Sequence, residues 1–371
     1  MAKEKILIMC NTYFQLITAI QMKLTMHSDA HVGVVLTDHT RGLPDIEEPL
    51  KECKVFNEVC CMECRLNDNA SSPDVEHILR TVYSIVMRSK KNAFFGKYFD
   101  KLIYFNLSAS TILLYNELQS VNKKIQVARF EEGVLSYGAS WNDDWRLIDS
   151  KSVKLGCRIR QWLGKTNITD YLEDYYCFFP ELYEGTLNPI AIPKISEENY
   201  KLKQILGKTF QLDTITERYD ERYIYFSSVG DFEGGSPVGE FDLVTKIAEL
   251  VGKKNLLIKT HPRDETGCYQ KAGFKVASMS AAPWEAIQLN SDFSEHVFLT
   301  NVSGSVLSVN LCMEKGPKTF FMYPLCDNKH NSATCGSETI LIRLIERLRG
   351  DPHFTRFSVV NHISEVIEAK D

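Results

Sequence analysis

The sequence predicts an α/β protein made of two Rossmann-like domains, each with a doubly wound parallel sheet. Three observations favour this fold class. Short continuous apolar runs, typical of strands buried on both faces of a parallel sheet, alternate with helical patterns along the chain. The alternation is interrupted between residues 151 and 200 and then begins again. The length of 371 residues suits two domains better than one.

The first part of the chain supplies the elements of one domain. Residues 5–10 form an apolar run that predicts a buried strand, and residues 13–24 follow with a helical pattern. Residues 106–110 contain serines that suit the cap of another helix. Further strands are predicted at 31–37, 54–59, 101–105 and 124–130, and a further helix at 75–87. This alternation predicts one domain over residues 1–155.

The second part of the chain repeats the alternation after a break. Residues 156–200 include an aromatic stretch, Pro189 and Pro193, which indicates a linker or boundary segment. Strands are then predicted at 223–227, 255–259, 296–300 and 318–322, with a helix at 241–251 and a helical C-terminus. We therefore expect a second domain over residues 201–371, whose last helix could pack back on the first domain.

Charge and cysteine usage exclude several classes of protein. The formal net charge is −5, so the chain lacks the basic field that a nucleic-acid-binding protein needs. The 11 cysteines are an odd number without regular spacing, which favours reduced thiols in the cytoplasm over a disulfide framework. No apolar run approaches the ~18 residues of a transmembrane helix. Cys60, Cys61 and Cys64 have no second pair of ligands nearby, so we expect no metal there.

The first candidate site residues follow the predicted strand 124–130. Glu131, Glu132 and Gly133 come directly after it. Ligands of open parallel sheets bind at the carboxyl ends of the strands, and a carboxylate there can accept a proton from an attacking hydroxyl. A solvated acidic turn is the alternative interpretation.

Two further polar clusters follow strands of the second domain. Pro262 ends the strand after Lys259 and favours an extended conformation at His261, whose imidazole could donate a proton to a leaving phosphate. Ser303-Gly304-Ser305 opens a predicted helix, where hydroxyls and free backbone N–H groups form an anion site. The alternatives are a histidine satisfied at a strand end and an ordinary serine N-cap.

In this order, the three clusters resemble motifs of bacterial sialyltransferases of the lipooligosaccharide sialyltransferase and capsule polysialyltransferase type. That group carries an acidic-acidic-Gly motif in its first domain, and a His-Pro motif and a Ser/Thr-rich motif in its second. Residues 6–16, with Asn11 and Gln15, are also similar to the start of such enzymes. The resemblance spans most of the chain and implies the GT-B arrangement, in which two Rossmann-like domains face a cleft.

The resemblance implies an inverting transfer of sialic acid from CMP-sialic acid to a hydroxyl of a glycan acceptor, such as lipooligosaccharide, capsule or an oligosaccharide. It makes Glu131 the general base, with Glu132 the second candidate, and His261 the acid toward the departing CMP. The residues implied in binding the donor are Ser303, Gly304, Ser305, Pro262, Lys259, Asn11, Gln15, Ser228 and Gly230. No metal or other cofactor is expected, because a histidine and a helix N-terminus can stabilise the charge of one phosphate.

Other functions also fit the sequence. Asp231 and Glu233, in the Gly-rich loop after Ser228, could be metal ligands of a metal-dependent glycosyltransferase. The His-Pro motif is shared with transferases that use CMP-Kdo. A non-catalytic glycan-binding protein would need neither Glu131 nor His261.

Residues 151–165 contain five basic side chains together with Trp162 and Leu163. Such a segment could hold a cytoplasmic enzyme on the inner face of a membrane, where lipid-linked acceptors are found. An ordinary solvated helix has a similar composition. The acceptor, the linkage and the oligomeric state stay open at this point.

Overall fold

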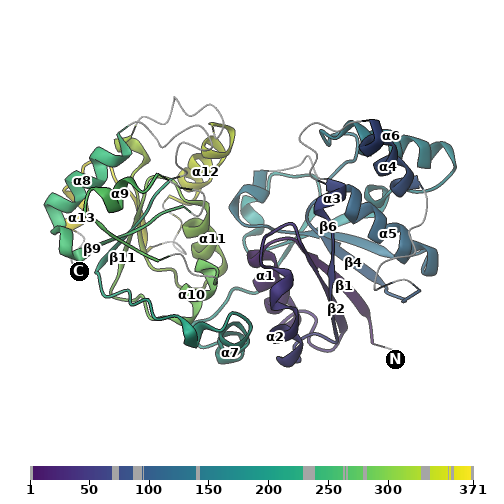
Figure 1. The fold of residues 1–371 in the computed structure, drawn as a ribbon, viewed down its shortest axis with the longest axis horizontal. Coiled ribbons are helices and arrows are strands. Elements are labelled where there is room, and N and C mark those ends of the chain that lie inside the picture. The colour runs from purple at the N-terminus through teal and green to yellow at the C-terminus, as the bar shows by residue number, and fades with distance from the viewer. Residues whose placement is uncertain are drawn as a thin grey trace. The chain divides into compact units, whose positions relative to one another are not determined.

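The fold is taken from a computed structural model. It describes residues 3–68, 75–86, 94, 96–138, 143–228, 239–261, 264, 266–278, 282–326, 335–349, 351 and 355–368. The chain divides into two compact units, each built on one parallel sheet with helices packed along it (Figure 1). The first unit is Met1–Pro193 with Tyr200–Phe210, and the second is Lys194–Asn199 with Gln211–Asp371. In the described part of the chain, no helix is long and apolar enough to span a membrane.

The sheet of the first unit has its strands in the order β3-β2-β1-β4-β5-β6-β7, and all of its pairs are parallel. The chain therefore builds outward from β1 in one direction and then from β4 in the other, which is the doubly wound arrangement. The strands are β1 Lys5–Cys10, β2 His31–Thr37, β3 Glu58–Met62, β4 Lys101–Tyr104, β5 Gln126–Phe130, β6 Leu172–Cys177 and β7 Asn188–Ala191.

Three helices of the first unit, α1, α5 and α6, begin at residues whose side chains cap them. The side chains of Thr12, Ser108 and Ser150 accept hydrogen bonds from backbone N–H groups three residues ahead. The helices of this unit are α1 Tyr13–Leu24, α2 Glu47–Glu52, α3 Arg65–Asp68, α4 Val75–Val86, α5 Ala109–Val121, α6 Lys151–Trp162 and α7 Tyr200–Thr209. Their inner faces cover a core that includes Leu7, Leu102 and Tyr115, all fully buried.

The second unit repeats the same topology with the strand order β10-β9-β8-β11-β12-β13, again with parallel pairs. Its strands are β8 Tyr223–Phe226, β9 Leu256–Lys259, β10 Lys275–Val276, β11 Val297–Thr300, β12 Lys318–Phe321 and β13 Phe357–Val359. Its helices are α8 Glu240–Val251, α9 Cys268–Lys271, α10 Trp284–Asn290, α11 Gly304–Cys312, α12 Cys335–Leu348 and α13 Glu365–Glu368. The prediction of two Rossmann-like, doubly wound units is confirmed.

The predicted linker at residues 156–200 is wrong. This segment contains most of α6 and the strands β6 and β7, which complete the first sheet. Its aromatic stretch is buried because Tyr175 lies inside that sheet, against β5. The chain then enters the second unit and comes back, since α7 contacts α1 and α2 and the ring of Phe210 packs on Tyr13.

Two smaller expectations also differ from the structure. The strand predicted at 54–59 lies later, at β3, because Lys54 adopts a positive φ of 53° that ends the preceding turn. The last described helix, α13, belongs to the second unit. Its Val366 is buried in the core of the second unit, in the cluster that contains Tyr225 and Leu299.

Candidate active site

The acidic turn of the first unit lies at the carboxyl end of β5. Gly133 has a positive φ of 88°, which a residue with a side chain rarely adopts, so the chain can turn sharply after Glu132. Ser136 fixes the turn, because its hydroxyl donates to the Gly133 carbonyl and accepts from the Glu132 N–H. The structure thus confirms that both carboxylates follow the strand, as the sequence indicates.

Glu131 is a buried carboxyl with defined partners. Its side chain is only 1% exposed, and its Oε2 atom accepts hydrogen bonds from the Tyr137 hydroxyl and from the Phe178 N–H. Burial raises the pKa of Glu131 to about 7, and these two hydrogen bonds oppose the rise. The arrangement ties the acidic turn to the segment after β6, so Glu131 has a clear role in holding the turn in place.

Glu132 differs from Glu131 in both exposure and partners. Its side chain is partly exposed, and within the described residues its carboxylate makes no hydrogen bond or ion pair. Burial raises its pKa to about 7, and the Arg129 cation opposes the rise. A partly exposed carboxyl whose pKa is raised toward neutrality can serve as a general base.

Asn11 and Gln15 lie after β1, two strands away from β5. The Oε1 atom of Gln15 accepts from the Asn11 N–H at 2.6 Å, and the Asn11 Oδ1 accepts from the Thr37 hydroxyl at 2.9 Å. Both residues are buried. Their observed contacts fix the turn between β1 and α1, and donor binding by either residue stays a prediction.

The polar groups of the second unit gather where its strand order reverses. β8 lies between β9 and β11, with Phe226 opposite both Lys259 and Thr300. The residues that follow these three strands therefore emerge at the same edge of the sheet, next to one another. They include Ser227 and Ser228, His261 and Ser303, at the position where doubly wound folds bind their ligands.

His261 is partly buried at this edge and is held through its backbone. Its N–H donates to the Ser227 hydroxyl at 3.3 Å, and its carbonyl accepts from the Asp264 N–H at 2.9 Å. Burial lowers the pKa of His261, the nearby Lys259 cation lowers it further, and Asp264 opposes the shift. The imidazole is therefore predominantly neutral at pH 7 in the ligand-free protein.

Lys259 is the last residue of β9 and places a cation beside His261. Its Nζ lies 5.5 Å from the centre of the Trp284 ring. Burial lowers the pKa of Lys259, and Glu285 opposes this. An anion bound at the same edge would be attracted to this cation.

Ser303 precedes α11 without capping it. Its hydroxyl makes no capping hydrogen bond and instead lies 3.1 Å from the hydroxyl of Ser305. The first N–H groups of a helix have no acceptor inside the helix, so the start of α11 presents N–H groups and two hydroxyls together. This geometry favours the anion site over the ordinary N-cap that the sequence left as an alternative.

Several predicted site residues lie outside the described residues. These are Pro262, Gly230, and the alternative metal ligands Asp231 and Glu233. Ser228 is described, and it is buried with a hydroxyl that makes no hydrogen bond within the described residues. Among those residues, no three His, Cys, Asp or Glu side chains come together as a metal site. Metal independence stays a prediction.

Sequence reasoning missed the residues that hold the motifs in place. Glu240, at the start of α8, accepts from the Ser228 N–H and the Tyr225 hydroxyl, both at 3.0 Å. Tyr137 and Ser136 perform a similar function at the acidic turn. An acidic residue in the first turn of a helix was the available signal for Glu240. The tyrosine gave no signal, because its contact depends on the folded turn.

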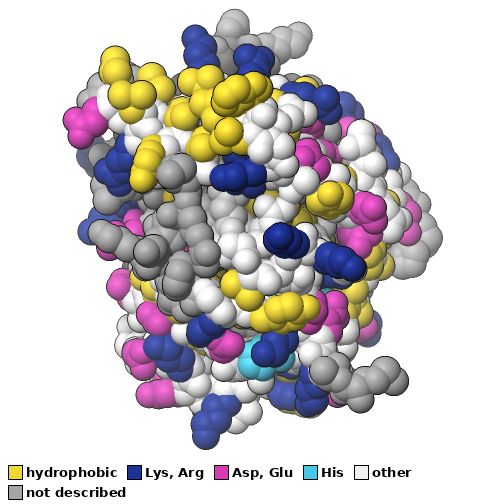
Figure 2. Space-filling model, turned by 90° about the vertical axis from the view of Figure 1, so that its right-hand side faces the viewer, with side chains coloured by type: hydrophobic (Ala, Val, Ile, Leu, Met, Phe, Trp, Pro, Cys, Tyr) yellow, Lys and Arg dark blue, Asp and Glu magenta, His cyan; other side chains and the backbone are white. Residues whose placement is uncertain are grey.

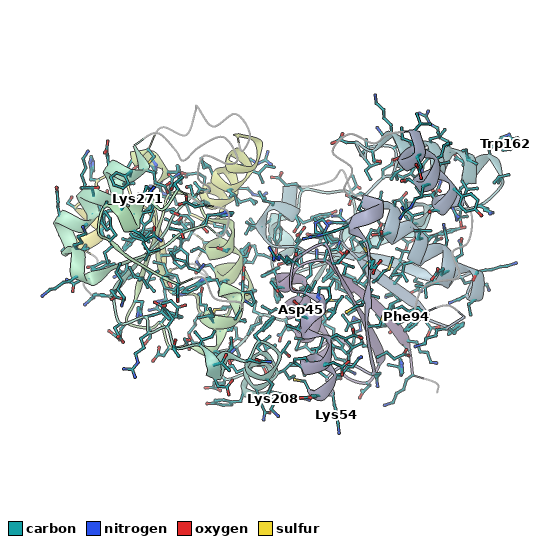
Figure 3. The ribbon with its side chains drawn as sticks, in the orientation of Figure 1. Asp45, Lys54, Phe94, Trp162, Lys208 and Lys271 are labelled. Atoms are coloured by element: carbon teal, nitrogen blue, oxygen red, sulfur yellow. The ribbon has the colours of Figure 1, made fainter. Side chains whose placement is uncertain are left out.

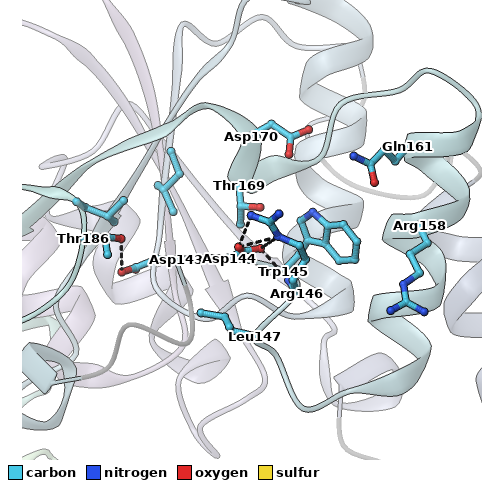
Figure 4. Close-up of a pocket in the computed structure, with 12 residues that line it drawn as sticks. Asp143, Asp144, Trp145, Arg146, Leu147, Arg158, Gln161, Thr169, Asp170 and Thr186 are labelled. Carbon is cyan, nitrogen blue, oxygen red and sulfur yellow. Dashed lines mark hydrogen bonds and ion pairs between the residues drawn. The ribbon is translucent and has the colours of Figure 1, made fainter.

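A pocket of about 710 Å³ lies elsewhere in the first unit, beside α6 (Figure 4). Leu172 begins β6 and Leu187 precedes β7, so the pocket lies near the amino ends of these strands, whereas the acidic turn lies at the carboxyl end of β5. Asp143 connects the two regions, because it pairs with the buried Arg129 of β5. The lining residues are Asp143, Asp144, Trp145, Arg146, Leu147, Arg158, Gln161, Thr169, Asp170, Leu172, Thr186 and Leu187.

The sequence also matches a known family. A family model described as alpha-2,8-polysialyltransferase matches residues 6–295, which include the acidic turn and His261. The chain belongs to the alpha-2,8-polysialyltransferase family. The chain is therefore a glycosyltransferase of the sialyltransferase class. A comparison with curated protein sequences finds no match.

Solved structures with a similar fold have low sequence identity to this chain. A UDP-N-acetylglucosamine 2-epimerase has a TM-score of 0.48 and 12% identity, and the match covers 96% of this chain and 90% of the epimerase. The UGT89C1 protein of Arabidopsis thaliana, complexed with UDP-L-rhamnose, has a TM-score of 0.47 and 13% identity. That match covers 99% of this chain and 89% of UGT89C1. An α/β-galactoside α-2,3-sialyltransferase from Photobacterium phosphoreum has a TM-score of 0.44 and 10% identity. That match covers 98% of this chain and 100% of the sialyltransferase. Similarity at this level carries no argument about function.

Proposed function

We propose that this enzyme transfers sialic acid from CMP-sialic acid to a sialic-acid-terminated glycan, with inversion at the anomeric carbon. The family supports the reaction class, and its name supports an α2,8 linkage. The observation that carries the donor assignment is the edge of the second sheet. There His261, Lys259 and the Ser303–Ser305 hydroxyls follow neighbouring strands at the point where the strand order reverses.

The groups of the second unit suit the leaving group of such a donor. When the bond between the anomeric carbon and the phosphate oxygen breaks, CMP departs with one additional negative charge. The α11 N-terminus, with the hydroxyls of Ser303 and Ser305, can donate hydrogen bonds to that phosphate. A bound phosphate also raises the pKa of the neighbouring His261, which then holds the proton that it delivers to the leaving oxygen.

The acidic turn of the first unit suits the acceptor. A general base must contact the attacking hydroxyl, and Glu132 is partly exposed whereas Glu131 is buried and engaged by Tyr137 and Phe178. Exposure therefore favours Glu132 as the base, although the motif resemblance gives that role to Glu131. The carboxylate takes the proton of the acceptor hydroxyl, the hydroxyl oxygen bonds to the anomeric carbon, and CMP leaves from the opposite face.

The acceptor is thus assigned to the acidic turn of the first unit, and the donor to the sheet edge of the second. No divalent metal is required, because the charge to be stabilised belongs to one phosphate and donors for it are present. The use of CMP-sialic acid in preference to CMP-Kdo rests on the family.

The direct test is to incubate the purified chain with CMP-sialic acid and either a lactose-terminated or a sialoside-terminated acceptor, and to analyse the products by mass spectrometry. We expect sialic acid to be added to the sialoside, and CMP to be released in equal amount. A parallel incubation with CMP-Kdo is the control. Transfer only from CMP-Kdo would overturn the donor assignment, and transfer only to lactose would overturn the acceptor assignment.

A further inference from the structure

The apolar side of α4 faces outward. Leu79 and Tyr83 are 64% and 65% exposed, and Val75 lies four residues before Leu79 and is also exposed. Residues four apart lie on the same face of a helix, so these three form one stripe. Ile78, Val82 and Val86 flank the stripe and are only partly buried. The apolar side of an amphipathic helix normally packs on the core, so this orientation is unusual.

The opposite side of α4 is fixed against α6 and α5, which accounts for the orientation. Gly156 of α6 lies so close to Ile85 that a Cβ atom on this glycine would be 2.8 Å from the Ile85 side chain. The Ile85 carbonyl accepts hydrogen bonds from the Asn116 amide at 2.7 Å and from the buried Arg160 at 3.3 Å. The helix therefore cannot turn its apolar stripe inward without breaking these contacts.

The neighbouring helix α6 also exposes apolar side chains. Leu155 and Leu163 are exposed, and Trp162 is 84% exposed. Figure 3 shows Trp162 pointing away from the unit at the end of α6. Lys165 joins the two helices, because its Nζ donates to the Val86 carbonyl at the end of α4. Figure 2 views this side of the molecule and shows hydrophobic side chains gathered near the top, with Lys and Arg side chains and some Asp and Glu side chains near them.

The net charge of the two helical segments is opposite to that of the whole chain. Residues 75–86 and 151–165 contain a single acidic side chain, Glu76, whereas the formal net charge of the protein is −5. The basic side chains at the surface of these segments are Arg80, Lys151, Lys154, Arg158 and Lys165. Arg160, the remaining basic side chain of residues 151–165, is buried and donates to the Thr166 carbonyl at 2.6 Å. The sequence-based expectation that it contacts lipid is therefore wrong.

We propose that the outer face of α4 and α6 is a docking surface for an anionic lipid bilayer. Apolar and aromatic side chains on a helix surface, bordered by lysine and arginine, match the interface of such a bilayer, where apolar groups enter the acyl boundary and cations meet the headgroups. Symmetric pairing of two copies through this face would place the same cations opposite one another, which is unfavourable. The residues of this surface lie far in sequence from His261, so membrane docking does not depend on which CMP-sugar is the donor.

Vesicle flotation with the full chain tests the proposal. We expect the protein to float with vesicles of phosphatidylcholine that contain phosphatidylglycerol, and to bind vesicles of phosphatidylcholine alone much more weakly. Replacing Leu79, Tyr83 and Trp162 together by Ser should weaken binding to the anionic vesicles at least about tenfold. Arg158→Gln should weaken it about fivefold, and added salt should weaken it further.

Matched variants elsewhere on the same unit are the controls. Tyr200→Ser removes an equally exposed tyrosine and Lys208→Gln an exposed lysine, and neither should change vesicle binding. All variants should keep the melting temperature of the unmodified protein and its turnover with a soluble acceptor. If the unmodified protein shows no transferase activity but binds anionic vesicles, the proposed function fails and the docking surface stands. Equal binding to neutral and anionic vesicles, or an unchanged triple variant, would overturn the docking surface. A dimer in solution that the triple variant converts into a monomer, without vesicle binding, would also overturn it.

Discussion

At the residue scale, the two neighbouring glutamates of the acidic turn, Glu131 and Glu132, have different surroundings. Glu131 is buried and receives two hydrogen bonds, whereas Glu132 is partly exposed and makes none within the described residues. Both have a pKa raised to about 7 by burial. The first residue is thus suited to holding the turn and the second to accepting a proton from a substrate.

Replacing Glu132 by Gln should lower turnover by about 10²–10⁴-fold while CMP binding barely changes, because the base is lost and the shape is kept. Turnover is measured by CMP release, and CMP affinity by calorimetry. Glu131→Gln is the matched variant and should retain more activity. Near-normal turnover in Glu132→Gln together with an inactive Glu131→Gln would return the role of base to Glu131.

The buried Glu131 should make stability depend on pH. Its pKa is about 7 in the folded protein and near its ordinary value of 4.5 when unfolded, so the folded state binds the proton more tightly. The contribution of Glu131 to the free energy of unfolding is therefore fully present below about pH 4.5 and is lost as the pH rises through 7. Glu131→Gln should remove this loss and raise the free energy of unfolding at pH 8 by roughly 2–3 kcal/mol, as measured by urea denaturation. An equal stability of the two proteins at pH 8 would contradict this account.

His261 should set the alkaline limb of the pH profile. Burial and Lys259 lower its pKa in the free protein, and a bound phosphate opposes this. The alkaline limb of kcat, which reports the bound state, should thus lie at higher pH than the alkaline limb of kcat/KM. In His261→Ala the limb should disappear, and both turnover and CMP affinity should fall. An alkaline limb that persists in this variant would belong to another group.

At the scale of single elements, the start of α11 is the feature with the clearest chemistry. Serine at the beginning of a helix usually caps it, but Ser303 contacts Ser305 instead. Two hydroxyls and the helix N–H groups then remain available for an anion.

The Ser303→Ala, Ser305→Ala double variant should bind CMP more weakly, because each lost hydrogen bond to a charged group contributes about 1.5–3 kcal/mol. Binding should not vanish, since the backbone N–H groups remain. Calorimetry measures the affinity, and the melting temperature should change little because neither hydroxyl caps the helix. Unchanged CMP affinity would place the phosphate elsewhere.

The elements also show what the sequence could and could not predict. Continuous apolar runs identified β1, β2, β4, β8 and β11 correctly, since strands buried on both faces leave that pattern. β6 begins with Leu172, Glu173 and Asp174, and β7 contains Pro189, which is tolerated at a sheet edge, so neither resembles a buried strand. The positions of the three motifs at strand ends were predictable. The difference between Glu131 and Glu132 was not, because it depends on contacts with Tyr137 and Phe178 that form only on folding.

At the scale of the whole molecule, the proposed chemistry is divided between the two units, with the base on the first and the leaving-group residues on the second. We expect activity to survive EDTA, because no step of the proposed reaction uses a metal. The measurement compares initial rates with and without the chelator, and with added Mn²⁺. Loss of activity on chelation, restored by Mn²⁺, would favour the metal-dependent alternative with Asp231 and Glu233.

The route of the chain between the two units has a consequence for protein engineering. The chain leaves the first unit after Pro193, returns at Tyr200 to form α7, and leaves again after Phe210. A cut after Pro193 would separate the first unit from the buried Leu202 and Leu206 of α7, whereas a cut after Phe210 would take the buried Ile195, which pairs with Met313, from the second unit. No single breakpoint in this region yields two intact halves. Chimaeras that exchange one half with a related enzyme will therefore need to move α7 together with residues 1–193, and partial proteolysis here should release damaged fragments.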